Sequence, residues 1–302
     1  MTVITPPVTS RAPIRILSAA ALLYPFIAIL APKAMVVLLV VSALLMIVAP
    51  VNRRAALFGR WTAAGAILAL DLAGREGLQF PLLVLAETQT AGRGRKTNRW
   101  WTDAGALCFS LVLDSTSRAL PPSRWPQASL TAGLAVCEAL EELLTDVETD
   151  VDVQLKWPND VYVNRKKISG VLLESPHLKH GKLVIGVGIN VNNSLDTAPA
   201  EISDTATAMC DVADQQFPLA TVLVCVLDKL FERLNQIGYH DQQLGELWRK
   251  RCLLTGRKVH VDTAHREFAG LCQGIDEAGA LLVQTDTNIE RCLAGTITLV
   301  EG

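Results

Sequence analysis

Between residues 81 and 193 the chain alternates short apolar segments with clusters of glycine, proline and asparagine. Apolar segments of this kind predict β-strands, and the residues between them favour turns. In this region, helical spacing of apolar side chains is found at residues 129–145. Parallel strands need long crossover connections, so strands this closely spaced cannot all be parallel. A mixed sheet of the α+β class is therefore predicted, rather than a doubly wound parallel sheet.

The predicted elements divide the chain into three parts. Strands are expected at residues 81–87, 106–114, 153–163 with a turn at 158–160, 166–175 and 182–193, and helices at 63–74, 129–145, 221–237 and 244–252. Short strands separated by turn residues follow them, a pattern typical of a small β-barrel. We therefore predict an apolar extension at 1–55, an α+β domain at 56–253 and a barrel at 254–302.

Residues 14–49 form an apolar stretch in which Lys33 is the only charge after Arg15. A helix that crosses a bilayer needs about 20 apolar residues, and residues 16–31 and 34–49 each come close to that length. One interpretation is a transmembrane hairpin with its arginine-rich flanks in the cytoplasm. A cleaved signal peptide, a wrongly extended start and a buried helical pair are the alternatives. The hairpin would attach the chain to a membrane. With the hairpin, a wrongly extended start or a buried helical pair, everything after residue 55 would lie in the cytosol.

The composition argues against several classes of function. The net charge is −2, so no overall basic field favours nucleic acid as a partner. The seven cysteines form no CxxC pair and no cluster with histidine, which argues against a zinc site or a disulfide framework and suits a reducing cytosol. The five histidines are expected to be surface or structural residues. Neither a Walker A sequence nor a G-x-S-x-G nucleophile motif is present.

A flexible basic loop, AGRGRKTNRWW at residues 91–101, interrupts the apolar segments. Glycine lets a backbone approach a phosphate closely, and the forked donors of Arg93 and Arg95 suit its charge. An exposed, mobile basic loop explains the same residues, and Trp100 suits a packing anchor. Taken alone, the loop does not decide between these interpretations.

The turn KWPND at residues 156–160 offers a cation, an amide and a carboxylate close together. Lys156 suits a carboxylate or a phosphate, and Asp160 suits Mg²⁺ beside phosphate oxygens. An ordinary hairpin turn with a solvated lysine is the alternative.

Lys167 begins an apolar strand, where it either extends its stem to reach solvent or directs its ammonium group at a ligand carboxylate.

Two glycines, Gly186 and Gly188, interrupt the apolar segment 182–193. Interior glycines weaken a strand and often mark the close approach of a ligand. No helix pattern follows them, so the dinucleotide-binding fingerprint does not apply. Asn190 and Asn192 share one face of the strand, so one of them can point toward a site.

Taken together and in this order, these segments resemble biotin protein ligases. The resemblance lies in ETQTAGRGR…W (87–100), KWPNDVYV (156–163), KKISGVLLE (166–174), VIGVGINVN (184–192) and the tail GRKV…GIDEAGALLV…GTITL (256–299). It spans residues 62–302. Some family members repress transcription through a helix-turn-helix domain, and no such pattern precedes these segments.

The resemblance implies a catalytic domain similar to class II aminoacyl-tRNA synthetases, followed by an SH3-like barrel. It implies an ATP- and Mg²⁺-dependent ligase in which the biotin carboxylate attacks the α-phosphate to give biotinyl-adenylate. The acyl group then passes to a lysine of the biotin carboxyl carrier domain of acetyl-CoA carboxylase or a related carboxylase. A homodimer is one expected assembly, and a nucleic-acid partner is not expected.

The resemblance also implies roles for particular residues. For biotin it implies contacts from Gln89, Gly92, Arg93, Gly94, Arg95, Lys167, Gly170 and Gly188. For ATP it implies contacts from Arg93, Arg95, Trp100, Asn159, Asp160 and Asn190, with Asp160 also at Mg²⁺. The implied catalytic residues are Lys156, Lys167, Arg95 and Asp160.

One segment departs from the family pattern. Where the family has a Ser-Thr-Asn-like motif that contributes to biotin binding, this chain has Ala64-Gly65-Ala66. Those hydroxyl and amide contacts are missing unless Thr62 substitutes for them, which puts the affinity for biotin in doubt. Two alternative functions therefore remain at this point: an acyl ligase that uses lipoate or octanoate, and a membrane-tethered biotin-binding protein with weak ligase activity.

Overall fold

The computed structural model describes residues 55–59, 65–75, 78, 80–86, 89, 91–116, 120–145, 150–175, 181–263 and 265–300. The apolar segment 14–49, and with it the choice between its interpretations, lies outside the described residues. Within the described ranges, no helix is both long enough and apolar enough to cross a bilayer.

The larger sheet is mixed, as predicted. Its strands are β1 (Ala55–Gly59), β2 (Leu82–Ala86), β3 (Leu107–Asp114), β4 (Val153–Lys156), β5 (Asp160–Val163), β6 (Lys166–Glu174) and β7 (Lys182–Ile189). Their order across the sheet is β1-β2-β3-β7-β6-β5-β4. The pair β1–β2 is parallel and the other neighbours are antiparallel. Strand β1 was not predicted, because its five residues have no alternation and are specified by pairing with β2.

The helices are α3 (Gly65–Ala73), α4 (Trp125–Leu143), α5 (Ala200–Ser203), α6 (Met209–Ala213), α7 (Leu219–Leu234) and α8 (Asp241–Arg251), with a 3₁₀ turn, η1, at Pro122–Arg124. The helix predicted at 129–145 begins earlier than predicted, because α4 already starts at Trp125 with a proline in its first turn. Proline is tolerated there, since the first N–H groups of a helix have no partner within it. The short helices α5 and α6 were not predicted.

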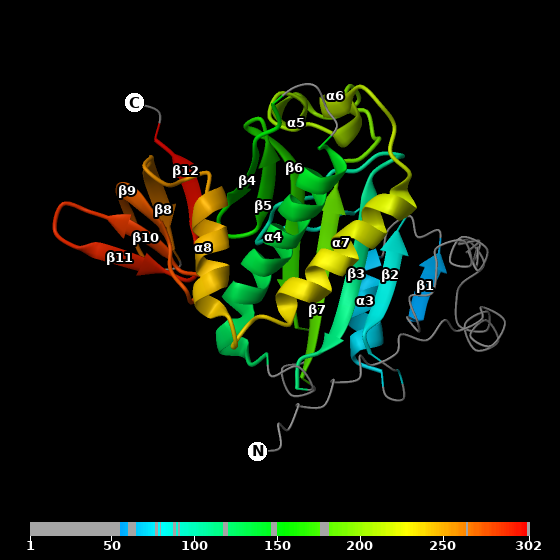
Figure 1. Cartoon of the computed structure of the whole chain (residues 1–302), viewed down its shortest axis with the longest axis horizontal. Coiled ribbons are helices and arrows are strands. Elements are labelled where there is room, and N and C mark those ends of the chain that lie inside the picture. Colours follow the sequence, from blue (N-terminus) through cyan, green and yellow to red (C-terminus); the bar gives the residue numbers. More distant parts are fainter. Residues whose placement is uncertain are drawn as a thin grey trace, which may run out of the picture.

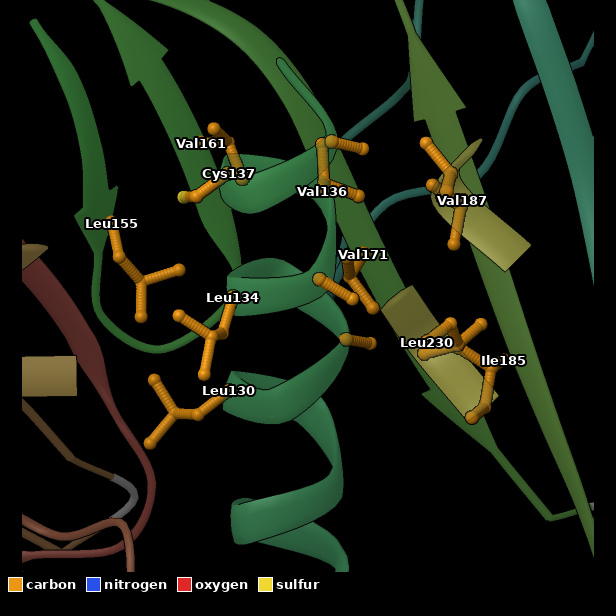
Figure 2. Close-up of a cluster of buried hydrophobic side chains, with 14 of the residues drawn as sticks. Leu130, Leu134, Val136, Cys137, Leu155, Val161, Val171, Ile185, Val187 and Leu230 are labelled. Atoms are coloured by element: carbon orange, nitrogen blue, oxygen red, sulfur yellow. The ribbon is translucent and has the colours of Figure 1, made fainter. Parts of the chain in front are cut away.

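The main core lies between one face of the larger sheet and the helices α4 and α7. Figure 2 shows Leu130 and Leu134 of α4 and Leu230 of α7 facing Leu155, Val171 and Ile185 of the strands. Period-two alternation sends the odd-numbered residues of β3, such as Phe109 and Leu111, into this core.

The opposite face of the sheet carries the even-numbered residues of β3 and β7. Helix α3 packs on one end of it, against Val84, Val112 and Val184. The remainder of this face, from Ser110 to Cys108 along β3, is not covered by α3 and borders the site.

The tail forms a second, antiparallel sheet, as predicted. It consists of β8 (Lys258–Asp262), β9 (Glu267–Ile275), β10 (Leu281–Gln284), β11 (Ile289–Cys292) and β12 (Thr296–Leu299), in the order β11-β10-β9-β8-β12. Figure 1 shows it beside α8, next to the β4 edge of the larger sheet. Trp157 donates a hydrogen bond from Nε1 to Gly279 O at 3.0 Å, and Gln127 donates one from Nε2 to Glu277 O at 2.7 Å. The two sheets therefore share one buried boundary.

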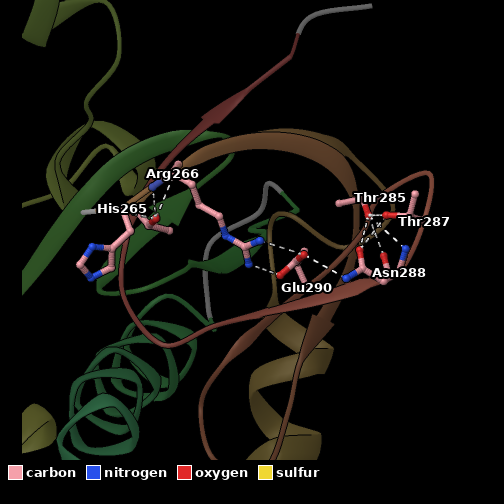
Figure 3. Close-up of polar contacts among 7 residues, drawn as sticks. His265, Arg266, Thr285, Thr287, Asn288 and Glu290 are labelled. Atoms are coloured by element: carbon pink, nitrogen blue, oxygen red, sulfur yellow. Dashed lines mark hydrogen bonds and ion pairs between the residues drawn. The ribbon is translucent and has the colours of Figure 1, made fainter.

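Polar side chains connect two turns of this smaller sheet (Figure 3). Arg266, in the β8–β9 turn, donates to both carboxylate oxygens of Glu290. Asn288 donates to Glu290 Oε1 at 3.0 Å, and Thr285 Oγ1 donates to Asn288 O at 2.9 Å. These exposed contacts hold the turns in register and contribute little to the stability of the fold.

Candidate active site

A cavity of about 250 Å³ opens on the sheet face that α3 leaves uncovered. Its walls come from the basic loop, the 156–160 turn, strands β6 and β7, and strand β12 of the smaller sheet. It brings together every predicted site residue except Gly92 and Asn190. Their individual roles in binding and catalysis remain predictions.

The two exceptions have structural contacts instead. The Gly92 carbonyl accepts a hydrogen bond from the Trp100 N–H at 3.0 Å, and a Cβ at Gly92 would lie 2.1 Å from Trp100 O. Only glycine allows this approach of the two backbones. Asn190 is buried and donates from Nδ2 to Thr207 O at 3.1 Å, while its Oδ1 accepts a bond from Asn193. No contact with the cavity supports the predicted role of Asn190 in ATP binding.

The floor of the cavity is a row of small residues. The strand registers align Cys108 of β3, Gly188 of β7, Gly170 of β6 and Asp160 of β5. A Cβ at Gly188 would be 2.5 Å from the Cε2 and Nε1 atoms of Trp100, and a Cβ at Gly170 would be 3.3 Å from its Cζ3 atom. The Trp100 ring therefore lies against the two glycines. Cys108 does not line the cavity but packs with Trp100, and burial raises the pKa of its thiol to about 12.

The basic loop is a short hairpin in this structure. Its ends are joined by the bond from Trp100 N–H to Gly92 O, and Arg93 and Arg99 form a β-bridge. Nearer the tip, the Gly94 N–H donates to Asn98 O at 2.9 Å. This backbone pairing directs Arg93 and Arg95 to the cavity lining.

The lining has an excess of positive charge: six cationic side chains against two carboxylates. Lys167 Nζ lies 2.7 Å from Asp160 Oδ1 and 5.7 Å from the centroid of the Trp100 ring. Arg93 Nη2 lies 2.6 Å from Glu174 Oε1. Such a concave, cationic surface attracts anions.

Two of these cations are partly desolvated. Burial lowers the pKa of Lys156, with a counteracting effect from Asp160 and a further lowering by Lys167. Burial also lowers the pKa of Arg95, and Asp160 opposes that shift. Both side chains are therefore poorly compensated by the residues around them, and a bound anion would stabilise their charged forms.

The smaller sheet also contributes to the cavity. Arg95 Nη2 donates to Gly295 O at 3.2 Å, and Lys96 Nζ donates to Thr296 Oγ1 at 2.9 Å. Thr296 and Ile297 of β12 line the cavity. Thr296 and Ile297 were not predicted from the sequence, because a contact between segments so far apart in the chain leaves no local motif.

Ser110, Leu172 and Val184 also line the cavity and were not predicted, whereas Gly186 lines it as the paired glycines suggested. One signal was present: Ser110 is the only hydroxyl residue in the apolar strand LCFSLVLD. Leucine and valine have no comparable signal, because a pocket wall and a core position require the same residue types.

Comparisons with known proteins indicate one family. Residues 66–192 match the model of the Biotin/lipoate A/B protein ligase family, and residues 255–300 match that of the Biotin protein ligase C terminal domain. The chain is 33% identical over 223 residues to "Bifunctional ligase/repressor BirA" of Bacillus subtilis, covering 72% of this chain and 66% of that protein, which is just under two thirds of its length. It is 32% identical over 203 residues to "Biotin--[acetyl-CoA-carboxylase] ligase" of Mycobacterium tuberculosis, covering 66% of this chain and 72% of that one.

A solved structure is similar over most of both chains. Biotin protein ligase from Aquifex aeolicus, in complex with biotin and ATP, superposes with a TM-score of 0.69 at 30% sequence identity. The superposition covers 82% of this chain and 99% of that one.

The contact between Trp100 and Gly188 predicts a difference between two substitutions in β7. Gly188→Ala should lower the free energy of unfolding by about 1–3 kcal/mol, because its Cβ would overlap the indole ring. Gly186→Ala is the matched control, since its Cβ would meet neighbouring atoms only at 3.5 Å or more. Urea unfolding of the two variants measures the difference, and equal losses would show that the ring does not constrain this position.

Proposed function

Because the chain belongs to the biotin protein ligase family, we propose that it is an ATP-dependent ligase that activates biotin as biotinyl-5′-AMP. It transfers the biotinyl group to one lysine of a biotin carboxyl carrier domain, in acetyl-CoA carboxylase or a related carboxylase. The observation that carries this proposal is the cavity itself. One end is lined by apolar and glycine residues of β6 and β7, and the other brings Lys156, Lys167 and Arg95 around Asp160.

The first step joins two anions. A carboxylate oxygen of biotin attacks the α-phosphorus of ATP, the bond from that phosphorus to the β-phosphate oxygen breaks, and pyrophosphate leaves. Lys156, Lys167 and Arg95 offset the repulsion between the carboxylate and the triphosphate. Catalysis consists mainly of holding the reactants in position and stabilising charge on the phosphate oxygens.

The second step forms the amide. The lysine nitrogen of the carrier attacks the carboxyl carbon of the mixed anhydride, and AMP leaves with the electrons of the broken C–O bond. The attacking amine has to lose a proton. Asp160 receives it in this proposal, because its carboxylate lines the cavity beside Lys167.

Mg²⁺ enters with ATP, and its chemistry is the neutralisation of phosphate charge. Within the described ranges, no group of three or more His, Cys, Asp and Glu side chains gathers into a metal site. Asp160, whose carboxylate lines the cavity, would hold Mg²⁺ beside the phosphate oxygens.

The remaining residues divide between the two substrates. In the proposal, Gln89, Arg93, Gly94, Gly170 and Gly188 contribute to the biotin site, and Arg93, Trp100 and Asn159 contribute to the ATP site. Gly92 acts through the backbone pairing of the basic hairpin. Residues 56–253 form the catalytic domain, of the class II aminoacyl-tRNA synthetase type, and residues 254–302 form an SH3-like barrel that supports the basic loop. A homodimer and a membrane anchor at residues 14–49 remain predictions from the sequence.

The activity is tested with the full chain, biotin, ATP, Mg²⁺ and a purified carrier domain. The expected result is release of pyrophosphate and a single biotinyl addition to the carrier, seen by intact mass. Lys167→Gln should abolish both, because it removes the cation at the carboxylate. An unmodified carrier at high enzyme concentration would contradict the proposal, and transfer of lipoate or octanoate instead would show a different acyl ligase.

Arg95→Gly should let the adenylate escape. Arg95 connects the basic loop to Gly295, and its loss removes a cation and a bond that hold the loop over the intermediate. The half-life of enzyme-bound adenylate should fall at least tenfold, as expected for the loss of a charged hydrogen bond. Rapid filtration after a single turnover measures it. Arg165→Gly, in an exposed turn, is the control, and equal half-lives in both variants would remove Arg95 from this role.

The lowered pKa of Lys156 predicts that the rate of adenylate formation depends on pH. Its pKa is lowered chiefly by burial, so its charge is lost at a lower pH than that of a free lysine. The kcat/KM for ATP should therefore fall on the alkaline side as pH rises through this lowered pKa. Lys156→Arg should keep the charge and move the fall to higher pH. Lys166→Arg, an exposed neighbour, should leave the profile unchanged, and identical profiles for all three proteins would refute the role of Lys156.

A further inference from the structure

The strand that carries Lys167 is irregular where it borders the cavity. Lys167 and Gly170 both line the cavity, although residues three positions apart in a regular strand point to opposite faces. The pairing of β6 with β5 explains this, because its register shifts between Val161 and Tyr162 and leaves Ile168 without a partner among the described residues of β5. Ile168 is buried in the main core. Such a β-bulge redirects side chains, and here it turns Lys167 from the core face of the sheet to the cavity face.

The backbone at this bulge is held by two segments from later in the chain. The Lys167 N–H donates to Thr205 O at 2.8 Å, and the Thr207 N–H donates to Lys167 O at 2.9 Å. The carbonyl of Ile168 accepts a hydrogen bond from the Asn190 N–H at 2.9 Å. A bulge interrupts the pairing of a strand with its neighbour, and these three bonds satisfy the buried backbone groups beside the interruption.

Asn190 connects the two segments. It is 3% exposed, and its Nδ2 donates to Thr207 O at 3.1 Å while its Oδ1 accepts a bond from Asn193 Nδ2 at 3.2 Å. Its main chain therefore holds the bulge at Ile168, and its side chain holds the segment that pairs with Lys167. All of these contacts lie behind Lys167, outside the cavity lining.

We propose that Asn190 is a positioning residue that fixes the direction of Lys167 through Thr207 and the bulge at Ile168. This inference rests on the proposed function, in which Lys167 meets the carboxylate of biotin. It takes the place of the direct contact with ATP that the resemblance implied for Asn190.

The chemistry of Lys167 explains why its backbone needs this support. A lysine ammonium lies at the end of a flexible four-carbon stem, so its position depends on where the backbone directs that stem. A catalytic group has to be held within about 0.5 Å of its productive position. The bond from Lys167 Nζ to Asp160 Oδ1, at 2.7 Å, fixes one end of the side chain. The bonds of Asn190 fix the other end.

A second asparagine provides a matched control. Asn192 Nδ2 donates to Phe217 O at 2.7 Å, and its Oδ1 accepts a bond from the Phe217 N–H at 2.9 Å. Asn192 also lies outside the cavity lining. Asn192→Ala therefore removes two hydrogen bonds just beyond the end of β7 and leaves the contacts around Lys167 in place.

The experiment compares Asn190→Ala with Asn192→Ala in the full chain. Calorimetry gives the Kd of biotin and of biotinol, in which an alcohol replaces the carboxylate. Asn190→Ala should weaken biotin about tenfold, as expected for the loss of a charged hydrogen bond from Lys167, and should leave the Kd of biotinol unchanged. In the Lys167→Gln background, Asn190→Ala should not weaken biotin further, because Asn190 acts through Lys167. Asn192→Ala should change none of these values.

Asn193→Ala is the second variant, and it decides the question if Asn190→Ala does not fold. It removes the hydrogen bond to Asn190 Oδ1 and leaves the bond from Asn190 to Thr207 in place. It should weaken biotin by a smaller factor than Asn190→Ala and should also leave biotinol unchanged.

Three results would overturn the inference while leaving the proposed function intact. In the first, the variants of Asn190 and Asn193 bind biotin as tightly as Asn192→Ala does. In the second, biotin and biotinol weaken equally, which would indicate a general distortion of the cavity. In the third, the KM for ATP rises while the Kd of biotin is unchanged, which would assign Asn190 to the nucleotide. A wild-type chain that binds no biotin and releases no pyrophosphate would overturn the proposed function as well.

Discussion

The contact between the Trp100 ring and two glycines of the larger sheet determines the geometry of the cavity. Gly188 and Gly170 pair across β7 and β6, and a side chain on Gly188 would overlap the ring. Trp100 also closes the basic hairpin through its bond to Gly92. A displaced ring would therefore move the loop that carries the arginines. Glycine weakens a strand, but at Gly188 and Gly170 the indole ring occupies the space that a side chain would fill.

The charges of the cavity follow from this placement. Asp160 and Glu174 compensate Lys167 and Arg93, and Asp262 pairs with Lys96, so three of the six cations of the lining have no ion pair among the described residues. Lys156 and Arg95 are partly desolvated, so their charged forms are destabilised. An anionic ligand would offset that loss of hydration. The proposed substrates match this polarity, since biotin joins an uncharged ring to a carboxylate and ATP brings further negative charge.

The sequence predicted what is encoded locally. The alternation and turn residues between 81 and 193 predicted the strands of the larger sheet except β1, and the tail predicted a second, all-β unit. The loop, the turn and the paired glycines were predicted to lie in one site, and the cavity lining brings them together. Contacts between distant segments were not predictable in the same way. The approach of Thr296 to Lys96, the pairing of β1 with β2 and the start of α4 at Trp125 depend on packing that no local pattern specifies. Ser110 was not predicted because its place in the lining depends on which face of β3 borders the cavity.

In the proposed function, this cavity joins the carboxylate of biotin to the α-phosphate of ATP. Exchange of labelled pyrophosphate into ATP tests that step directly, because it requires a reversible adenylate and no carrier protein. The full chain should catalyse exchange that depends on biotin and Mg²⁺, and octanoate should not replace biotin. Exchange supported by octanoate alone, or none with biotin at high enzyme concentration, would contradict the account.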